Sequence, residues 1–194
     1  MTKPCADVSV NAAQTANISW TTADVELDCP PLLFRLIAAQ DEALISSLYT
    51  NDRIQQFISP ALNAPKAHRR FAAMQMANQT LCSDKCYLAI ADRQSNEALG
   101  LFAVFNLDIV ASRCEFGIML TEKAQGRGIA RHALTAILAH LQRQLGVRQI
   151  FCVINQHNLA AQRLARQCQL RLEVNDGSNL HYVLDEVITP WRMV

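Results

Sequence analysis

The sequence Cys114-Glu-Phe-Gly-Ile-Met-Leu-Thr-Glu-Lys-Ala-Gln-Gly-Arg-Gly-Ile-Ala130 decides the fold of this chain. Its first part, Phe116 to Leu120, is a short apolar run of the length expected for a buried strand. A polar segment follows, and then Gly126 and Gly128 stand directly before a long amphipathic pattern. The stretch therefore predicts a strand, a turn and a helix in this order.

This order of elements predicts an anion site. Because glycine has no Cβ, Gly126 and Gly128 allow the backbone to approach a ligand closely and to adopt unusual dihedral angles. The first amides of the following helix have no partner inside the helix, and they carry a partial positive charge. Arg127 and Arg131 add positive charge beside them. A pyrophosphate suits such a site, and a tight turn without a ligand is the alternative interpretation.

Two well-known phosphate-binding motifs do not match this stretch. A Walker loop ends in Gly-Lys-Ser or Gly-Lys-Thr, which is absent here. A dinucleotide fingerprint requires a third glycine where this chain has Arg131, and an acidic residue after the next strand, where it has Asn155. The sequence therefore indicates a different phosphate-bearing carrier.

The segment Gln125-Gly126-Arg127-Gly128-Ile129-Ala130 resembles the Gln/Arg-x-x-Gly-x-Gly/Ala signature of the GNAT N-acetyltransferases, whose loop holds the pyrophosphate of acetyl-coenzyme A (acetyl-CoA). A second stretch, Asn158 to Leu170, is similar to the family's Asn-x-x-Ser/Ala followed by a helix and a Gly-Phe pair. Two features differ from the family pattern: Ala165 stands where many members have a tyrosine, and Gln169-Leu170 replaces Gly-Phe.

The front of the chain resembles one branch of this family. Leu33 to Asp41 and Asp52 to Pro60 are similar to the RimJ/RimL-like branch, which acetylates ribosomal-protein N-termini and, in related members, polyamines. The resemblance implies an α/β GNAT fold, in which a mixed, mostly antiparallel twisted sheet is flanked by helices. It also implies transfer of an acetyl group from acetyl-CoA to a primary amine, in this branch a protein N-terminal amine.

The resemblance places the cofactor contacts by position. In the family, the strand before the loop diverges from the next strand and offers free amides to the acetyl group and the pantetheine arm. The cofactor-binding residues implied in this way are Ile118, Met119, Leu120, Gln125, Gly126, Arg127, Gly128, Ile129, Ala130, Asn155 and Asn158. Asn158 also precedes a helix, where its side chain can cap the backbone.

Glu115 is the candidate catalytic residue, as a general base acting directly or through a water. It stands in an otherwise apolar strand, where the resemblance places a base in several members. A salt bridge with Arg113 or another surface arginine is the alternative. The general acid stays open among His157, Cys168, Tyr182 and solvent, because Ala165 replaces the tyrosine.

Two alternatives to the N-terminal acceptor remain at this stage. The acceptor can instead be a polyamine, an aminoglycoside or another small amine. Polyamine acceptors usually call for a cluster of carboxylates, and Asp41, Glu42 and Asp52 provide only a small one. A non-catalytic acyl-CoA sensor is consistent with Ala165 and with Gln169-Leu170. The acceptor itself is not defined, because the segment 51–83 has no clear pattern.

Composition limits the class of protein. A chain of 194 residues suits one domain, and we expect a mobile N-terminal tail over residues 1–28 before a single domain over 29–194. The 18 basic and 17 acidic residues nearly cancel, which argues against nucleic acid as a partner. Seven cysteines without metal-site spacing indicate free thiols and no metal, and hence a cytoplasmic protein. No segment has membrane-span length, and a homodimer stays open.

Periodicity predicts the remaining elements. We expect strands over 32–37, 87–91, 98–105, 113–120, 147–154, 170–174 and 180–184, with a short added strand around 18–21. We expect helices from Asp41, over 52–57, from Pro65, from Ile129 to a stop at Gly146, and over 159–168.

Overall fold

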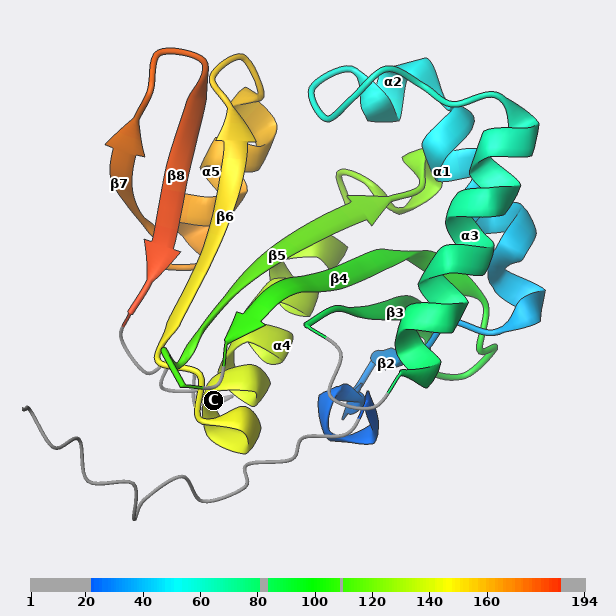
Figure 1. The fold of residues 1–194 in the computed structure, drawn as a ribbon, viewed down its shortest axis with the longest axis horizontal. Helices are drawn as coiled ribbons and strands as arrows, with labels where there is room; N and C mark the ends of the chain where they lie inside the picture. Colours follow the sequence, from blue (N-terminus) through cyan, green and yellow to red (C-terminus); the bar gives the residue numbers. More distant parts are fainter. Residues whose placement is uncertain (1–21, 81–83, 109, 186–194) are drawn as a thin grey trace, which may run out of the picture.

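The structure is a computed structural model that describes residues 22–80, 84–108 and 110–185 (Figure 1). Eight strands form one sheet in the order β1-β2-β3-β4-β5-β6-β8-β7. The strands are β1 Leu27–Cys29, β2 Leu32–Leu36, β3 Cys86–Asp92, β4 Ala98–Asp108, β5 Arg113–Leu120, β6 Gln149–Asn155, β7 Arg171–Asn175 and β8 Asn179–Leu184. The helices are α1 Glu42–Thr50, α2 Asp52–Gln55, α3 Ala64–Gln79, α4 Ile129–Leu145 and α5 Leu159–Gln167, with 3-10 turns η1 Thr22–Val25, η2 Ala39–Asp41 and η3 Glu122–Ala124.

The sheet is antiparallel at every described pairing except one. Only β5 and β6 run parallel, and β6 pairs with β8 on its other side. The predicted hairpin near the C-terminus is confirmed as β7 and β8. The predicted fold class, a mostly antiparallel sheet flanked by helices, is therefore confirmed.

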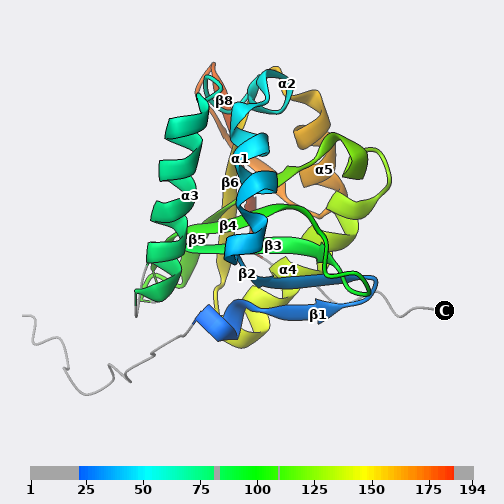
Figure 2. The same cartoon turned by 90° about the vertical axis from the view of Figure 1, so that its right-hand side faces the viewer.

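Two apolar cores lie on opposite faces of the sheet. One packs α1 and α3 against β3 and β4, with Phe71 and Tyr87 among its members. The other packs α4 and the C-terminal end of α5 against the opposite face, with Phe102 and Phe116 stacked at 6.0 Å between ring centroids. Figure 2 shows α1 and α3 on one side of the strands and α4 on the other. The sheet thus separates two helical layers.

The helix ends follow from their capping residues. α4 begins after Gly128 and ends before Gly146, and both glycines have the left-handed backbone conformation expected at these positions. Asn51 and Asn63 cap α2 and α3 through their side-chain oxygens. The stop at Gly146 is confirmed, whereas α2 ends at Gln55 and is shorter than predicted.

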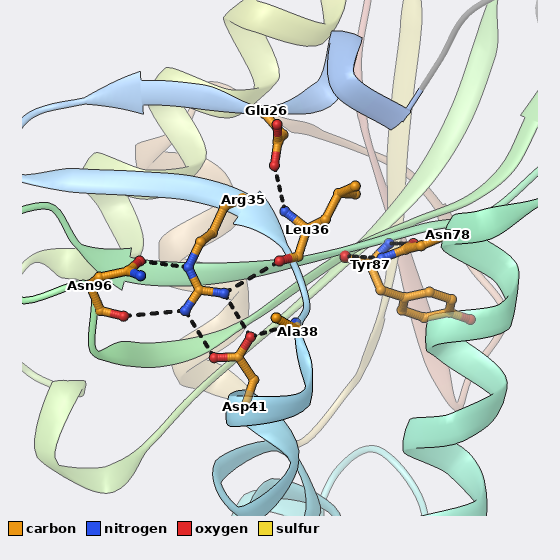
Figure 3. Close-up of polar contacts among 8 residues, drawn as sticks. All are labelled: Glu26, Arg35, Leu36, Ala38, Asp41, Asn78, Tyr87 and Asn96. Carbon is orange, nitrogen blue, oxygen red and sulfur yellow. Dashed lines mark hydrogen bonds and ion pairs between the residues drawn. The ribbon is translucent and has the colours of Figure 1, made fainter.

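The residues just before Cys29 are not part of a tail. Residues 22–28 form η1 and most of β1, and β1 pairs with β2. Val25 is buried in the apolar core that packs α4 against the sheet. The Glu26 carboxylate accepts a hydrogen bond from the Leu36 N–H at 2.8 Å (Figure 3). The prediction of a tail up to residue 28 is therefore wrong at its C-terminal end, because Val25 and Glu26 make contacts that their polar surroundings in the sequence conceal. The strand expected around 18–21 lies outside the described residues.

A buried ion pair fixes the connection between β2 and α1 (Figure 3). Two nitrogens of the Arg35 guanidinium contact the two Asp41 carboxylate oxygens at 2.7 and 2.9 Å, and Asp41 is only 2% exposed. The Ala38 N–H also donates to Asp41, and Arg35 Nε donates to the Asn96 side chain at 2.6 Å. The hydrogen bond to Asp41 raises the pKa of Arg35. The pair therefore holds α1 against the sheet through a bidentate, charge-assisted contact.

Asn78 performs a similar task for α3. Its side chain donates to the Tyr87 carbonyl at 2.8 Å and accepts from the Tyr87 N–H at 2.9 Å (Figure 3). The last turn of α3 is thereby fixed to the start of β3.

Replacing Arg35 tests the ion pair. Arg35→Met leaves the Asp41 carboxylate buried without its partner, so we expect the free energy of unfolding to fall by about 3–5 kcal/mol. Arg93→Met is the matched control, because Arg93 forms an ion pair with Asp28 in which the two side chains are 49% and 51% exposed. We expect at most about 1 kcal/mol from that change. Urea unfolding measures both, and equal losses would contradict the role of burial.

Candidate active site

β5 and β6 separate soon after they pair. Their parallel pairing covers only Arg113–Glu115 with Gln149–Phe151, and Figure 1 shows the two strands diverging beyond it. From Phe116 onward, the edge of β5 that faces β6 has no strand partner within the described chain. β6 has a central place in the sheet, yet Val153 is 42% exposed because the separation uncovers it. The divergence of these two strands, which the family resemblance implied, is therefore present.

A cleft of about 420 Å³ occupies this separation. Glu115, Gly117 and Met119 pair with Phe105, Ala103 and Leu101 of β4, so these side chains lie on the sheet face that α1 and α3 cover. Ile118 alternates to the other face and packs with the α4 core. The cleft therefore reaches both faces of the sheet at the point where the strands part.

The wall on the α1 side is apolar. It consists of Tyr49 from α1, Phe57 and Ile58 after α2, and Phe105 from β4. Burial raises the pKa of Tyr49 to about 12, so its hydroxyl is uncharged near neutral pH. Gly117 leaves this wall open, because a Cβ there would come within 3.3 Å of the Phe105 ring.

A buried glutamine fixes α2 over the cleft. Gln55 Nε2 donates to the Leu48 carbonyl at 2.9 Å and lies 3.3 Å from the Met119 sulfur. Its carbonyl oxygen accepts from the Ser59 hydroxyl. The Leu62 N–H then donates to the Tyr49 carbonyl at 2.8 Å and closes the loop. The α2 segment is thus attached to the sheet and to α1.

Glu115 lies in this cleft and carries no ion pair within the described chain. Asn106 Nδ2 donates to its Oε2 at 2.9 Å. The alternative of a salt bridge with Arg113 is wrong, because the Arg113 guanidinium lies over the Phe151 ring, 4.8 Å from the ring centroid. Among the described residues that line the cleft, Glu115 is the only carboxylate. It is therefore the group in the cleft best suited to accept a proton.

The cleft offers few other reactive groups. Cys152 lines it, but burial raises the pKa of this thiol to about 12, so the nucleophilic thiolate is disfavoured. His157, Cys168 and Tyr182, the candidates for a general acid, do not line the cleft, whereas Ala165 does. The Tyr182 hydroxyl is buried and has no hydrogen-bond partner in the described part of the chain. Solvent is then the simplest source of a proton on the α5 side.

The glycine loop has the geometry expected of an anion site. Gly126 and Gly128 have φ values of 72° and 75°, and a Cβ at either position would meet no atom within 4 Å. Between Gly126 and Arg131, no backbone N–H donates within the described protein, since the intrahelical bonds of α4 begin later. Gln125 fixes the approach to the loop by donating to the Leu120 carbonyl at 3.0 Å. These amides and the start of α4 can therefore receive an anion from solvent.

The other predicted cofactor contacts divide into two groups. Ile118, Met119, Asn155 and Asn158 line the cleft. The Leu120 side chain does not, because it is buried in the α4 core. The Asn158 side chain accepts from the Ala161 N–H, so its capping role is confirmed. Arg127, Ile129 and Ala130 lie in the glycine loop and the first turn of α4, with Arg127 exposed.

Three residues were not predicted from the sequence: Gly117, which lines the cleft, and Gln55 and Asn106, which contact lining residues. Gln55 and Asn106 act through partners 64 and 9 positions away, and no local pattern indicates such contacts. Gly117 had a signal, since a glycine inside an apolar strand often marks the close approach of a ligand or backbone.

Metal and membrane features are absent from the described ranges. No group of three or more His, Cys, Asp or Glu side chains in residues 22–80, 84–108 and 110–185 could hold a metal ion. No helix in these ranges has the length and apolar character needed to cross a bilayer.

Two diverging strands beside a loop of unpaired amides form an arrangement that suits the transfer of an acyl group from a phosphate-bearing carrier. The family model of the acetyltransferase (GNAT) domain matches residues 31–171. The chain therefore belongs to the GNAT acetyltransferases, which use acetyl-CoA as the acetyl donor. No curated protein matches the sequence.

Solved structures share this fold at low sequence identity. An acetyltransferase from Agrobacterium tumefaciens is 18% identical with a TM-score of 0.70, over 83% of this chain and 94% of that one. The spermidine N-acetyltransferase of Vibrio cholerae in complex with CoA and spermine is 17% identical with a TM-score of 0.68, over 80% and 96%. RimL, a ribosomal-protein α-N-acetyltransferase in complex with CoA, is 17% identical with a TM-score of 0.68, over 81% and 95%.

Substitution of Gly128 tests the anion loop. Gly128→Ala forces a side chain into a left-handed conformation, so the loop is expected to relax and misalign its amides. Loss of one or two charge-assisted hydrogen bonds weakens acetyl-CoA binding by roughly tenfold to a hundredfold. Isothermal titration measures the change.

The matched control is Gly177→Ala in the turn between β7 and β8. Gly177 has φ 88° and equally open surroundings. Replacing Gly177 by alanine forces a side chain into a similar left-handed conformation, with a similar loss of stability, but should leave acetyl-CoA binding unchanged. An unaltered affinity in Gly128→Ala would remove the loop from cofactor binding.

Proposed function

We propose that this enzyme transfers the acetyl group of acetyl-CoA to the N-terminal amine of a protein, with Glu115 as general base. The observation that carries the proposal is the position of Glu115, the single carboxylate among the described residues of the cleft, at the point where β5 and β6 part. In this proposal the loop from Gln125 to Ala130 binds the diphosphate of the cofactor. The free edge of β5 from Ile118 to Leu120 orients the acetyl end of the cofactor.

The reaction requires few groups. The amine nitrogen attacks the thioester carbonyl carbon, and its proton passes to Glu115 directly or through a water. Backbone N–H groups on the free edge of β5 stabilise the oxyanion that forms. The C–S bond then breaks, and solvent protonates the departing thiolate, since a thiol has a pKa of about 8.5. Alignment of the two substrates in the cleft supplies much of the rate enhancement.

The carboxylates considered for a polyamine acceptor are not available as a cluster. Asp41 is buried and bonded to Arg35, Glu42 pairs with His68, and Asp52 is exposed outside the cleft lining. A polyamine carries several positive charges, whereas the described cleft contains one carboxylate. This charge balance supports an acceptor with one amine at the site and argues against the polyamine alternative.

A non-catalytic acyl-CoA sensor is the second candidate. It is favoured by Ala165, which lines the cleft where a proton donor would otherwise stand. Titration with acetyl-CoA, followed by a thiol-release assay on N-terminal peptides, spermidine and an aminoglycoside, separates the candidates. Release on peptides supports the proposal, release only on small amines supports a small-molecule acceptor, and binding without release supports the sensor.

Replacing Glu115 tests the general base. Glu115→Gln removes the proton acceptor, so turnover should fall strongly at pH 7. The loss should be much smaller above pH 9, because an N-terminal amine, with a pKa of about 7.7–8.0, is then already deprotonated. The pH dependence of kcat measured by thiol release checks this result.

The control is Glu97→Gln, a change on the exposed turn between β3 and β4. It should leave the pH profile unchanged, and both variants should bind acetyl-CoA as the parent protein does. A Glu115→Gln enzyme with the parent profile would exclude Glu115 from proton transfer.

A further inference from the structure

The acceptor side of the cleft is built from apolar side chains around one charge. Phe57, Ile58 and Phe105 line it together with the Met119 side chain, and Glu115 is the sole carboxylate among the described lining residues. The described lining contains no lysine, arginine or histidine. An ammonium group can therefore be neutralised at Glu115, whereas a second charge would have no counterpart in this wall.

Two large apolar side chains stay exposed on this cleft. Ile58 is 55% exposed and Val153 is 42% exposed, and they reach the cleft from the α2 segment and from β6 respectively. An exposed apolar patch beside a polar site commonly marks a place where a ligand covers it. Their positions on different elements place apolar surface on more than one side of the opening.

The apolar wall is held in place. Gln55 anchors α2 through Leu48 and Met119, and the Leu62 to Tyr49 backbone bond closes the segment that carries Phe57 and Ile58. A fixed wall can discriminate between substrates because it does not adapt to a mismatched group at low cost.

We infer that the acceptor, on the basis of the proposed function, is a protein N-terminus whose first side chain is apolar. Glu115 would receive the terminal amine, and the Phe57, Ile58 and Val153 surface would cover the first side chain. A serine or an acidic first residue would leave this surface exposed or place a second charge against it. Discrimination in kcat/KM of about tenfold to a hundredfold is expected for such a pocket.

A peptide series that varies only the first residue tests the inference. Peptides beginning with Leu, Met, Ala, Ser, Asp or Lys are compared by thiol release with the full-length protein. We expect Leu and Met to be acetylated about tenfold or more faster than Ser and Asp, in kcat/KM. Equal rates, or faster release with Ser or Asp, would overturn the inference and leave the proposed function intact. Release with none of the peptides would overturn both.

A pair of variants links the preference to the wall. Ile58→Ser should reduce the ratio of Leu to Ser kcat/KM severalfold, since it removes apolar surface from the cleft. Leu159→Ser is the matched control, because Leu159 is 58% exposed but lies outside the cleft lining. It should leave the ratio unchanged. An unchanged ratio in Ile58→Ser would also overturn the inference.

A second, independent observation concerns the partner of Glu115. Asn106 has φ 49°, a left-handed conformation that is uncommon for residues other than glycine. It lies at an irregularity of the β4 and β5 pairing, where three steps along β4 from Phe105 to Asp108 match two steps along β5. This extra residue is a β-bulge, a feature that redirects side chains next to active sites.

The bulge aims the Asn106 amide at the catalytic candidate. Asn106 Nδ2 donates to Glu115 Oε2 at 2.9 Å, and Oε1 makes no hydrogen bond within the described chain. We propose that Asn106 is a positioning residue that holds one carboxylate oxygen so that the other faces the acceptor amine. This role acts through Glu115 and involves no contact between Asn106 and the substrate.

A double-mutant cycle tests this role. Asn106→Gly keeps the positive φ accessible and removes the amide, so kcat should fall by about threefold to tenfold with an unchanged KM for acetyl-CoA. In the Glu115→Gln background the same change should have no further effect. Asn96→Gly is the matched control, because Asn96 also has a positive φ (58°) and a side-chain hydrogen bond but lies outside the cleft lining, so the change should leave kcat unchanged. Parental activity in Asn106→Gly, or a loss that adds fully to that of Glu115→Gln, would overturn the role.

Discussion

The short pairing between β5 and β6 is the constraint on which the site depends. β5 is hydrogen-bonded to β4 over nearly its whole length but to β6 over only three residue pairs. Backbone groups on the remaining edge of β5 need partners, and no described strand supplies them. The same divergence admits a ligand between the two helical layers and brings Glu115 to its inner end. The cleft is thus a direct product of the sheet topology.

Charge is distributed so that one carboxylate remains available in the cleft. The Asp41 carboxylate serves α1 through Arg35, and Glu42 is paired with His68 on α3. The glycine loop instead combines free amides, a helix N-terminus and the exposed Arg127 side chain, all of which favour an anion. The two ends of the site therefore have opposite electrostatic character, which suits a phosphate carrier at one end and an amine at the other.

Local signals in the sequence were sufficient for most of the architecture. The glycines around α4, the Asn158 cap of α5 and the hairpin turn each act within a few residues, so their elements were predicted correctly. The contacts that shape the acceptor side were not predictable in this way. Gln55 reaches Met119, and Asn106 reaches Glu115 through a bulge. At the edge of the sheet, away from the cleft, Glu26 contacts β2 in a similar way. Such contacts join distant positions and leave no periodic pattern, and the α2 segment that carries Gln55 has little pattern of its own.

The closed α2 segment has an evolutionary consequence. Its ends meet at the Tyr49 and Leu62 backbone bond, and Gln55 is its buried anchor to the sheet. A segment with adjoining ends can change in length and composition without disturbing the scaffold around it. This segment is therefore the part of the cleft wall that can vary while the strands on either side of the cleft stay the same. Transplanting the segment between Tyr49 and Leu62 from one related protein to another would use the same property in the laboratory.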